Sequence, residues 1–269
     1  MADILQQNML FSCVHEQHFG SEQLVSHHAL GMVISGVMEI FTPEETIFLE
    51  AGTIGIMRKN TLLKTKKHPS PDGKPFKSFS LFLTEADLKT FALKNGIPLQ
   101  ERFTGNPLYE IPGDGFFQGF FQSVIPYFDK PDYFTPKIAD LKTNEVIELL
   151  LQLDSAYFLP YLFDFSEPFK IDLEAFMQKN YLFNIPISEF ARLSGRSIST
   201  FKRDFSRIFD DTPEKWLKQQ RLSEAKKLLQ TTRLRPSDVY LHVGFENFSH
   251  FSHAFKNQFG YNASSVVSL

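Results

Sequence analysis

Hydrophobic and polar positions alternate over short segments between residues 24 and 83, and this spacing predicts strands. Residues 76–83, Phe-Lys-Ser-Phe-Ser-Leu-Phe-Leu, alternate over much of their length, as a half-buried strand should. Residues 30–41 are rich in strand-forming side chains and are broken by Gly31 and Gly36.

Two further segments complete this β-rich part. Residues 46–57 predict two short strands around a turn at Ala51-Gly52. Residues 66–75 carry dense turn residues and predict a loop. Several short strands in succession favour a small barrel or a jelly roll.

Helical spacing follows the strands. Thr84 is a suitable N-cap because Asp87 stands three residues later, in the capping-box position. The apolar face of this helix would consist of Leu88, Phe91 and Ala92.

Two more segments place apolar residues at helical spacing. The first ends before Pro126, and its apolar positions are Phe116, Phe117, Phe120, Phe121, Val124 and Ile125. The second, residues 140–153, has a wide apolar face. That face is either core alone or core that also forms a dimer surface, because exposed apolar helices commonly mark interfaces.

A linker is predicted at residues 164–170, Asp-Phe-Ser-Glu-Pro-Phe-Lys, with Pro168 as the breaker. From Ile171 onward the pattern is helical with short turns. A long helix is expected from about Pro213 to Gln230, with Pro213 in its first turn. Its apolar face comprises Trp216, Leu217, Leu222, Ala225, Leu228 and Leu229.

Two helix-turn-helix patterns flank this long helix, at residues 187–205 and 236–256. Gly195 and Gly244 mark equivalent turns, 49 positions apart. Two such units in one chain can present two helices to one face of a DNA duplex.

In the first unit, Ser197 is the expected N-cap of the second helix. The predicted buried stripe is Ile198, Phe201, Phe205 and Ile208. The opposite side carries Ser199, Lys202, Arg203, Ser206 and Arg207. Lysine and arginine there can donate to guanine edges or to phosphates.

In the second unit, Asn247 is the expected cap, and the predicted buried stripe is Phe251, Phe255 and Phe259. The outward side carries Ser249, His250, Ser252, His253, Lys256 and Asn257. Across both units, phosphate contacts, which position a protein without reading sequence, are expected from Arg192, Arg196 and Lys256.

The charge distribution agrees with a DNA-binding back part. The 269 residues suffice for one large domain or two ordinary ones, and their net charge is −3. Residues 1–169 carry 13 Lys and Arg against 21 Asp and Glu, whereas residues 170–269 carry 15 against 10. The resulting net charges, −8 and +5, predict that only the back part attracts phosphate.

Other compositional features favour a cytoplasmic protein. No apolar run reaches the ~18 residues of a membrane span, and residues 1–7 lack the pattern of a signal peptide. Cys13 is the only cysteine, so neither an internal disulfide nor a cysteine zinc site can form. We expect a cytoplasmic location, no membrane partner and no cofactor.

The region from about Ile171 to Val266 resembles the C-terminal domain of the AraC/XylS family of transcriptional regulators. The residues that carry the resemblance are Ala191, Leu193, Ser194, Gly195, Phe205, Pro213, Arg221, Leu222, Ala225, Leu228, Leu229, Val243, Gly244, Phe245, Ser249, His250, Phe251, Phe255, Lys256, Phe259 and Gly260. The resemblance implies binding to promoter DNA, with both recognition helices in adjacent major-groove segments about one helical turn, ~34 Å, apart.

The resemblance also implies which residues read bases: Ser199, Lys202 and Arg203 in the first unit, and Phe248, Ser249, His250 and His253 in the second. Arg196, Arg207, Asn247 and Lys256 complete the candidate DNA contacts.

The second unit departs from the family pattern. The family commonly has Arg at the position of His253 and Gln at that of Phe248. After Gly260 it usually has Thr-Pro and an aromatic residue, where this chain has Asn262-Ala263 and Val266. We therefore expect the first recognition helix to supply more specificity than the second.

The front part resembles the cupin-like regulatory domain of the same family, through residues 34–36 and 48–56. The expected fold class is α+β. Residues 1–165 would form a cupin-like β-barrel with helices, including a helical dimerisation part at about 135–165. Residues 170–269 would form an all-α domain of two helix-turn-helix units joined by a long helix. In the family the front domain binds a small effector, binds a protein partner or only dimerises.

An enzymatic role has little support in the sequence. A metal cupin needs a His-x-His pair, a Glu and a later His. His27 and His28 are adjacent, so on a strand they point to opposite faces. We therefore expect no metal site.

Three hypotheses remain: a promoter-binding regulator controlled through residues 1–165, a cupin-type enzyme with a helical appendage, and an architectural DNA binder. We favour the regulator. Its expected partners are double-stranded promoter DNA, RNA polymerase, an effector or regulatory protein, and a second copy of the chain.

Overall fold

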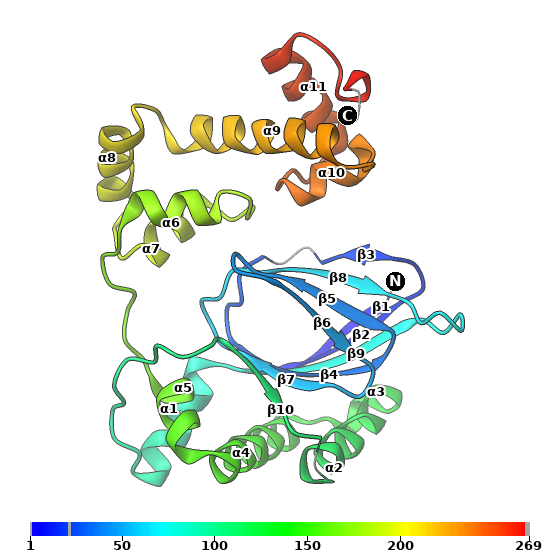
Figure 1. Cartoon of the computed structure of the whole chain (residues 1–269). Coiled ribbons are helices and arrows are strands. Elements are labelled where there is room, and N and C mark those ends of the chain that lie inside the picture. The colour runs from blue at the N-terminus through cyan, green and yellow to red at the C-terminus, as the bar shows by residue number, and fades with distance from the viewer. Residues whose placement is uncertain (1, 21–22, 114, 267–269) are drawn as a thin grey trace. The chain divides into compact units, whose positions relative to one another are not determined.

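Two antiparallel sheets and a layer of helices form the N-terminal part of the chain (Figure 1). This computed structural model describes residues 2–20, 23–113 and 115–266; residues 1 and 267–269, at the ends of the two predicted domains, lie outside the described residues. Within these ranges, the larger sheet has the order β1 (Ala2–Gln6), β2 (Met9–Val14), β9 (Phe76–Leu83), β4 (His28–Ser35), β7 (Ile54–Met57), β10 (Leu108–Ile111). The smaller sheet has the order β3 (His18–Phe19), β8 (Lys64–His68), β5 (Val37–Phe41), β6 (Thr46–Glu50).

The helices of this part cover one face of the larger sheet (Figure 1). They are α1 (Glu85–Asn95), α2 (Gly115–Val124), α3 (Pro126–Asp129), a 3₁₀ turn at Pro131–Tyr133, α4 (Pro136–Leu153) and α5 (Ser155–Phe163). Side chains alternate between the two faces of a strand. Accordingly, Phe79 of β9 packs in the core shared with the helices, whereas Phe76 packs with Met38 and Leu49 of the smaller sheet.

The C-terminal part is helical and forms a second compact unit, Glu167–Leu269, separate from Met1–Ser166. Its helices are α6 (Leu173–Asn180), α7 (Ile187–Leu193), α8 (Ile198–Phe209), α9 (Pro213–Thr231), α10 (Pro236–His242) and α11 (Phe248–Phe259), followed by a 3₁₀ turn at Ala263–Ser265. The predicted α+β class is confirmed. None of the described helices is both long and apolar enough to cross a membrane.

Most of the predicted strands are confirmed. Strands β6 and β7 flank the turn at residues 51–52, and β9 covers residues 76–83. The break between β4 and β5 lies at Gly36, whose φ is +79°. The predicted break at Gly31 is wrong, because Gly31 lies inside β4 and pairs with Ser80 and Gly55.

The predicted loop at residues 66–75 is too long. Lys66–His68 belong to β8, which pairs with β5. The sequence Lys-Thr-Lys-Lys-His has no apolar alternation, so its pairing depends on backbone hydrogen bonds to a strand already in place. Strands β1, β3 and β10 were not predicted, and each of them lies at a sheet edge. Strand β2, inside the larger sheet between β1 and β9, was not predicted either.

The helical predictions are confirmed with changes at their edges. Thr84 and Asp87 form the capping box: the Asp87 N–H donates to Thr84 Oγ1 at 3.1 Å and the Thr84 N–H donates to Asp87 Oδ2 at 3.0 Å. Phe116 is 74% exposed and is not part of the apolar core. Helix α4 begins at Pro136, earlier than predicted, because Thr135 caps it.

The predicted linker at residues 164–170 is wrong at its first residue. Asp164 is only 3% exposed. Its carboxylate accepts hydrogen bonds from Arg58 at 2.6 Å and from the Phe103 N–H at 3.1 Å. Burial acts to raise the pKa of Asp164, but the hydrogen bonds from Ser166 and Phe103 and the charge of Arg58 outweigh it and lower the pKa. Asp164 is therefore an ionised anchor of the N-terminal unit.

His28 lies at the start of β4 and is fully buried beside the Tyr161 ring, at 5.4 Å between ring centroids. Neither ring nitrogen has a hydrogen-bond partner. Burial, with the charges of Arg58 and Lys59, holds the pKa of His28 well below its usual value of 6.5. The folded protein therefore keeps this imidazole neutral.

This environment predicts a pH dependence of stability. Below pH 6.5 His28 becomes protonated in the unfolded state but stays neutral in the folded state. Its contribution to stability is therefore complete above pH 6.5 and is lost as the pH falls toward the lower pKa of the folded state. Each pH unit in that window removes at most about 1.4 kcal/mol. We expect His28→Phe to flatten the decrease in unfolding midpoint between pH 7.5 and 5.5.

Urea unfolding at several pH values measures this effect, with His253→Phe, at an exposed position, as the control. Identical pH profiles for wild type and His28→Phe would show that His28 does not titrate in this way.

Candidate nucleic-acid interface

The first helix-turn-helix unit consists of α7, a turn at Ser194-Gly195, and α8. Gly195 has a φ of +68°, and a Cβ there would lie 2.1 Å from the carbonyl carbon of Phe169. Only glycine fits this combination of a left-handed backbone and a close approach. Ser197 is the N-cap of α8, as predicted, and accepts from the Thr200 N–H at 3.3 Å.

Helix α8 buries its aromatic side and exposes its polar side. Phe201 and Phe205 are fully buried, but Ile198 and Ile208 are substantially exposed, so the predicted buried stripe is wrong at both ends. These isoleucines stand in the first and last turns, where neighbouring helices give less cover. The outward residues are all exposed: Ser199, Lys202, Arg203, Ser206 and Arg207.

The exposed cations of α8 make only loose contacts. Lys202 Nζ lies 3.2 Å from Glu214 Oε1 of α9, and both side chains are about half exposed. Arg203 Nε lies 3.8 Å from Asp204 Oδ1. Exposed ion pairs contribute ~1 kcal/mol or less, so a phosphate or base can replace these carboxylates at little cost.

Arg196 was predicted to contact phosphate, but its side chain is turned into the unit. Its side chain is only 6% exposed and donates to Asp204 at 3.2 Å. It also donates to the carbonyl oxygens of Ile171 at 2.9 Å and Ser194 at 2.7 Å. The guanidinium thus binds α8 to the segment before α6, a use that the sequence pattern did not reveal.

The second unit repeats the arrangement with α10, a turn at Gly244, and α11. Asn247 is the N-cap of α11, as predicted, and accepts from the His250 N–H at 3.0 Å. Phe251 and Phe255 are fully buried, whereas Phe259 is only partly buried. Ser249, His253 and Lys256 are exposed, as is His250.

Two of the candidate base-reading residues of α11 also contact aromatic neighbours. Phe248 packs against Tyr240 and Phe251, with ring centroids 5.6 Å and 6.2 Å apart. The His250 ring lies 5.8 Å from that of Phe245. These contacts hold Phe248 and His250 against other residues of the second helix-turn-helix unit, whereas the cations of α8 are only loosely paired.

Arg221, in the middle of α9, joins the two units. It donates to the carbonyl oxygens of Tyr181 at 2.8 Å and Phe183 at 2.7 Å, which precede α7. It also donates to the carbonyl oxygen of Gly244 at 3.3 Å, in the turn of the second unit. Burial lowers the pKa of Arg221 to about 10, so the side chain stays charged at neutral pH.

The sequence contains a signal for this role of Arg221. Arg221 lies four positions after Leu217 and four before Ala225, within the apolar stripe of α9. A lone arginine in such a stripe must be paired or hydrogen-bonded when buried. The described residues contain no group of three or more His, Cys, Asp or Glu suited to a metal ion.

Known protein families match both the N-terminal and the C-terminal unit of the chain. A helix-turn-helix domain model matches residues 190–267, and the ExsA N-terminal regulatory domain model matches residues 28–161. The virulence regulon transcriptional activator VirF of Yersinia enterocolitica is 27% identical over 146 residues, 54% of this chain and 54% of that protein. The transcriptional regulator ExsA of Pseudomonas aeruginosa is 28% identical over 126 residues, 46% of this chain and 45% of that protein.

The chain thus spans about half the length of the curated relatives it matches. Among solved structures, apo ToxT of Vibrio cholerae is similar over 96% of each chain, with 9% identity and a TM-score of 0.46.

Gly244 and Gly260 have similar backbone conformations but different surroundings, so substitutions at these two positions test the packing at the turn of the second helix-turn-helix unit. Gly244 has a φ of +84°, and a Cβ there would lie 2.6 Å from the Leu182 carbonyl oxygen; Gly260 has a φ of +83° with open space around it. We expect Gly260→Ala to cost about 1–2 kcal/mol, from the left-handed backbone alone. Gly244→Ala should cost at least about twice as much, because a backbone contact must also move.

Urea unfolding of the two variants measures the difference. Equal losses of stability would show that the contact between Gly244 and Leu182 does not constrain the turn.

Proposed function

Because this chain belongs to the AraC/XylS family of transcriptional regulators, we propose that it binds promoter DNA sequence-specifically and regulates transcription there. The observation that carries this proposal is the pair of capped recognition helices, α8 and α11, joined through Arg221 within one compact unit. Residues 170–269 would be the DNA-binding domain. In line with the names of VirF and its relatives, we propose activation as the sign of regulation.

The DNA contacts proposed for α8 are Ser199, Lys202, Arg203 and Arg207. For α11 and its cap they are Asn247, Phe248, Ser249, His250, His253 and Lys256. Arg196 is omitted because its guanidinium is bound inside the unit. The first helix would supply most of the specificity, since its cations are long and loosely paired.

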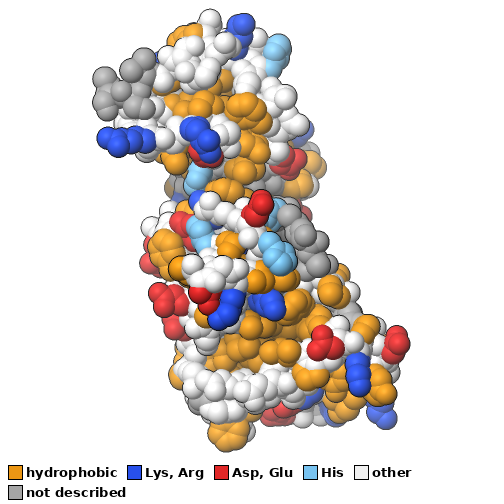
Figure 2. Space-filling model, turned by 90° about the vertical axis from the view of Figure 1, so that its right-hand side faces the viewer, with side chains coloured by type: hydrophobic (Ala, Val, Ile, Leu, Met, Phe, Trp, Pro, Cys, Tyr) orange, Lys and Arg blue, Asp and Glu red, His pale blue; other side chains and the backbone are white. Residues whose placement is uncertain are grey.

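Residues 1–165 would receive the regulatory signal from a small effector or a protein partner. RNA polymerase would be the partner at the promoter. The N-terminal unit also exposes large apolar side chains on α2, on the 3₁₀ turn and on α4: Phe116, Tyr133 and Leu141, the last 55% exposed. Figure 2 shows one face of the molecule, on which hydrophobic side chains gather between the charged ones. Exposed apolar patches commonly mark interfaces, so we propose this surface for a second copy of the chain.

Selection from random duplex DNA tests the proposed function directly. The full chain should enrich a sequence with two recognition segments about one helical turn apart. At ~150 mM salt the selected duplex should bind at least about 10³-fold more tightly than random duplex. Equal affinity for the two would reject sequence-specific regulation.

Arg203→Ala should separate base reading from phosphate contact. We expect it to cost about 1–3 kcal/mol in binding to the selected duplex and to relax the sequence preference. Lys227→Ala, on the exposed side of α9, should leave both quantities unchanged. A uniform loss across all sequences, with the preference intact, would instead make Arg203 a phosphate contact.

A further inference from the structure

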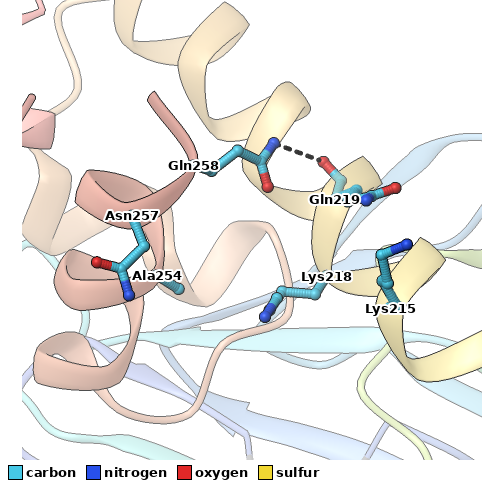
Figure 3. A pocket seen from close by; sticks show the side chains of 6 residues that line it. All are labelled: Lys215, Lys218, Gln219, Ala254, Asn257 and Gln258. Atoms are coloured by element: carbon cyan, nitrogen blue, oxygen red, sulfur yellow. Dashed lines mark hydrogen bonds between the residues drawn. The ribbon is translucent and has the colours of Figure 1, made fainter. Parts of the chain in front are cut away.

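A cleft of about 300 Å³ lies between α9 and α11, outside the candidate base-reading residues (Figure 3). Each helix contributes three of its lining residues: Lys215, Lys218 and Gln219 from α9, and Ala254, Asn257 and Gln258 from α11. These side chains supply two ammonium groups and three amides, with no carboxylate among them. Such a lining favours an anion, because lysine only donates and amides can also donate.

The two lysines differ in how strongly they are already neutralised. Lys215 Nζ lies 3.1 Å from Asp211 Oδ2, one helical turn away. For Lys218, no ion pair is formed with any residue that the structure describes. Figure 3 shows Lys218 extending from α9 toward Asn257 of α11, while Gln258 Nε2 donates to the Gln219 carbonyl oxygen at 3.5 Å. Lys218 is therefore the charge that the cleft offers to a ligand.

The cleft lies beside α9, the helix that connects the two helix-turn-helix units in the chain. On one side, Lys202 of α8 contacts Glu214, the residue before Lys215. On the other side, Asn257 is exposed on α11. Asn257 lies ten positions after the cap Asn247, as Arg207 lies ten positions after the cap Ser197. The cleft thus adjoins the outward face of α11 at Asn257, and it lies on α9, whose Glu214 contacts the outward face of α8 through Lys202.

Two helices that enter adjacent major-groove segments on one face of a duplex are separated by a minor groove and its two phosphate backbones. The protein surface between the helices must face this dense negative charge. We propose that the cleft formed by Lys215, Lys218 and Asn257 binds a backbone phosphate of duplex DNA between the two recognition segments. This inference rests on the proposed function and adds a contact that reads no bases.

Salt dependence of binding provides the first test. The full-length Lys218→Gln variant is compared with wild type on the selected duplex and on a random duplex, from 50 to 200 mM salt. A lost phosphate contact lowers the slope of log K against log salt by about 0.9. Over that fourfold rise in salt, wild type should therefore lose about 3- to 4-fold more affinity than the variant. The ratio of specific to random binding should not change.

Lys227→Gln is the matched control, because Lys227 is an exposed lysine on the same helix whose Nζ lies 3.6 Å from Glu224. It should retain the wild-type slope. A slope in Lys218→Gln equal to that of wild type would overturn the proposal, as would an equal decrease in Lys227→Gln.

A second test identifies the source of the phosphate. Methylphosphonate groups, which carry no charge, replace single backbone phosphates between the two recognition segments. At one position, the replacement should weaken DNA binding by wild type. At that position it should not weaken binding by Lys218→Gln any further, because this variant already lacks the contact. Additive losses at every position would reject the contact.

Competition with 20 mM inorganic phosphate at constant ionic strength distinguishes a site for a free anion. We expect wild type and Lys218→Gln to respond equally. A larger effect of phosphate on wild type, without any methylphosphonate-sensitive position, would assign the cleft to a free anion and overturn the DNA contact. Absence of any sequence preference in wild type would instead contradict the proposed function itself.

Discussion

The guanidinium of Arg221 binds backbone from both helix-turn-helix units of the C-terminal part. It donates to carbonyl oxygens on both sides of α9, those of Tyr181 and Phe183 before α7 and that of Gly244 in the second turn. Because a buried cation is costly unless its donors are satisfied, these carbonyls must stay in place around it. Helices α8 and α11 also both pack on α9, through Phe205 against Trp216 and through the core that Phe251 shares with Leu222, so Arg221 adds to a frame that these contacts already form.

A second set of buried charges determines where the N-terminal unit ends. Asp164 is bound to Arg58, and the Phe165 ring lies near the ammonium groups of Lys59 and Lys89, at 5.6 Å and 5.4 Å. In the C-terminal unit, the backbone of Phe169 already packs closely on Gly195. The stretch between these anchors is thus much shorter than the predicted linker.

The charges of the C-terminal unit serve two separate purposes. Arg196 and Arg221 are bound internally and hold helices together, whereas Lys202, Arg203 and Lys218 are exposed. The positive net charge of this half of the chain does not distinguish the two groups. The distinction matters for α11, whose Phe248 and His250 contact aromatic neighbours and whose outward face lacks long cations before Lys256.

The sequence by itself determined the features that arise from local physical chemistry. Helical periodicity, the caps Thr84, Ser197 and Asn247, and the left-handed glycines at 195 and 244 each depend on a few neighbouring residues. Only the tertiary structure decided that Lys66–His68 pair as a strand, that Asp164 is an anchor, and that Arg196 is buried. In each of these cases the partner lies elsewhere in the chain, and a residue's own type and spacing carry no information about which distant backbone or charge will meet it.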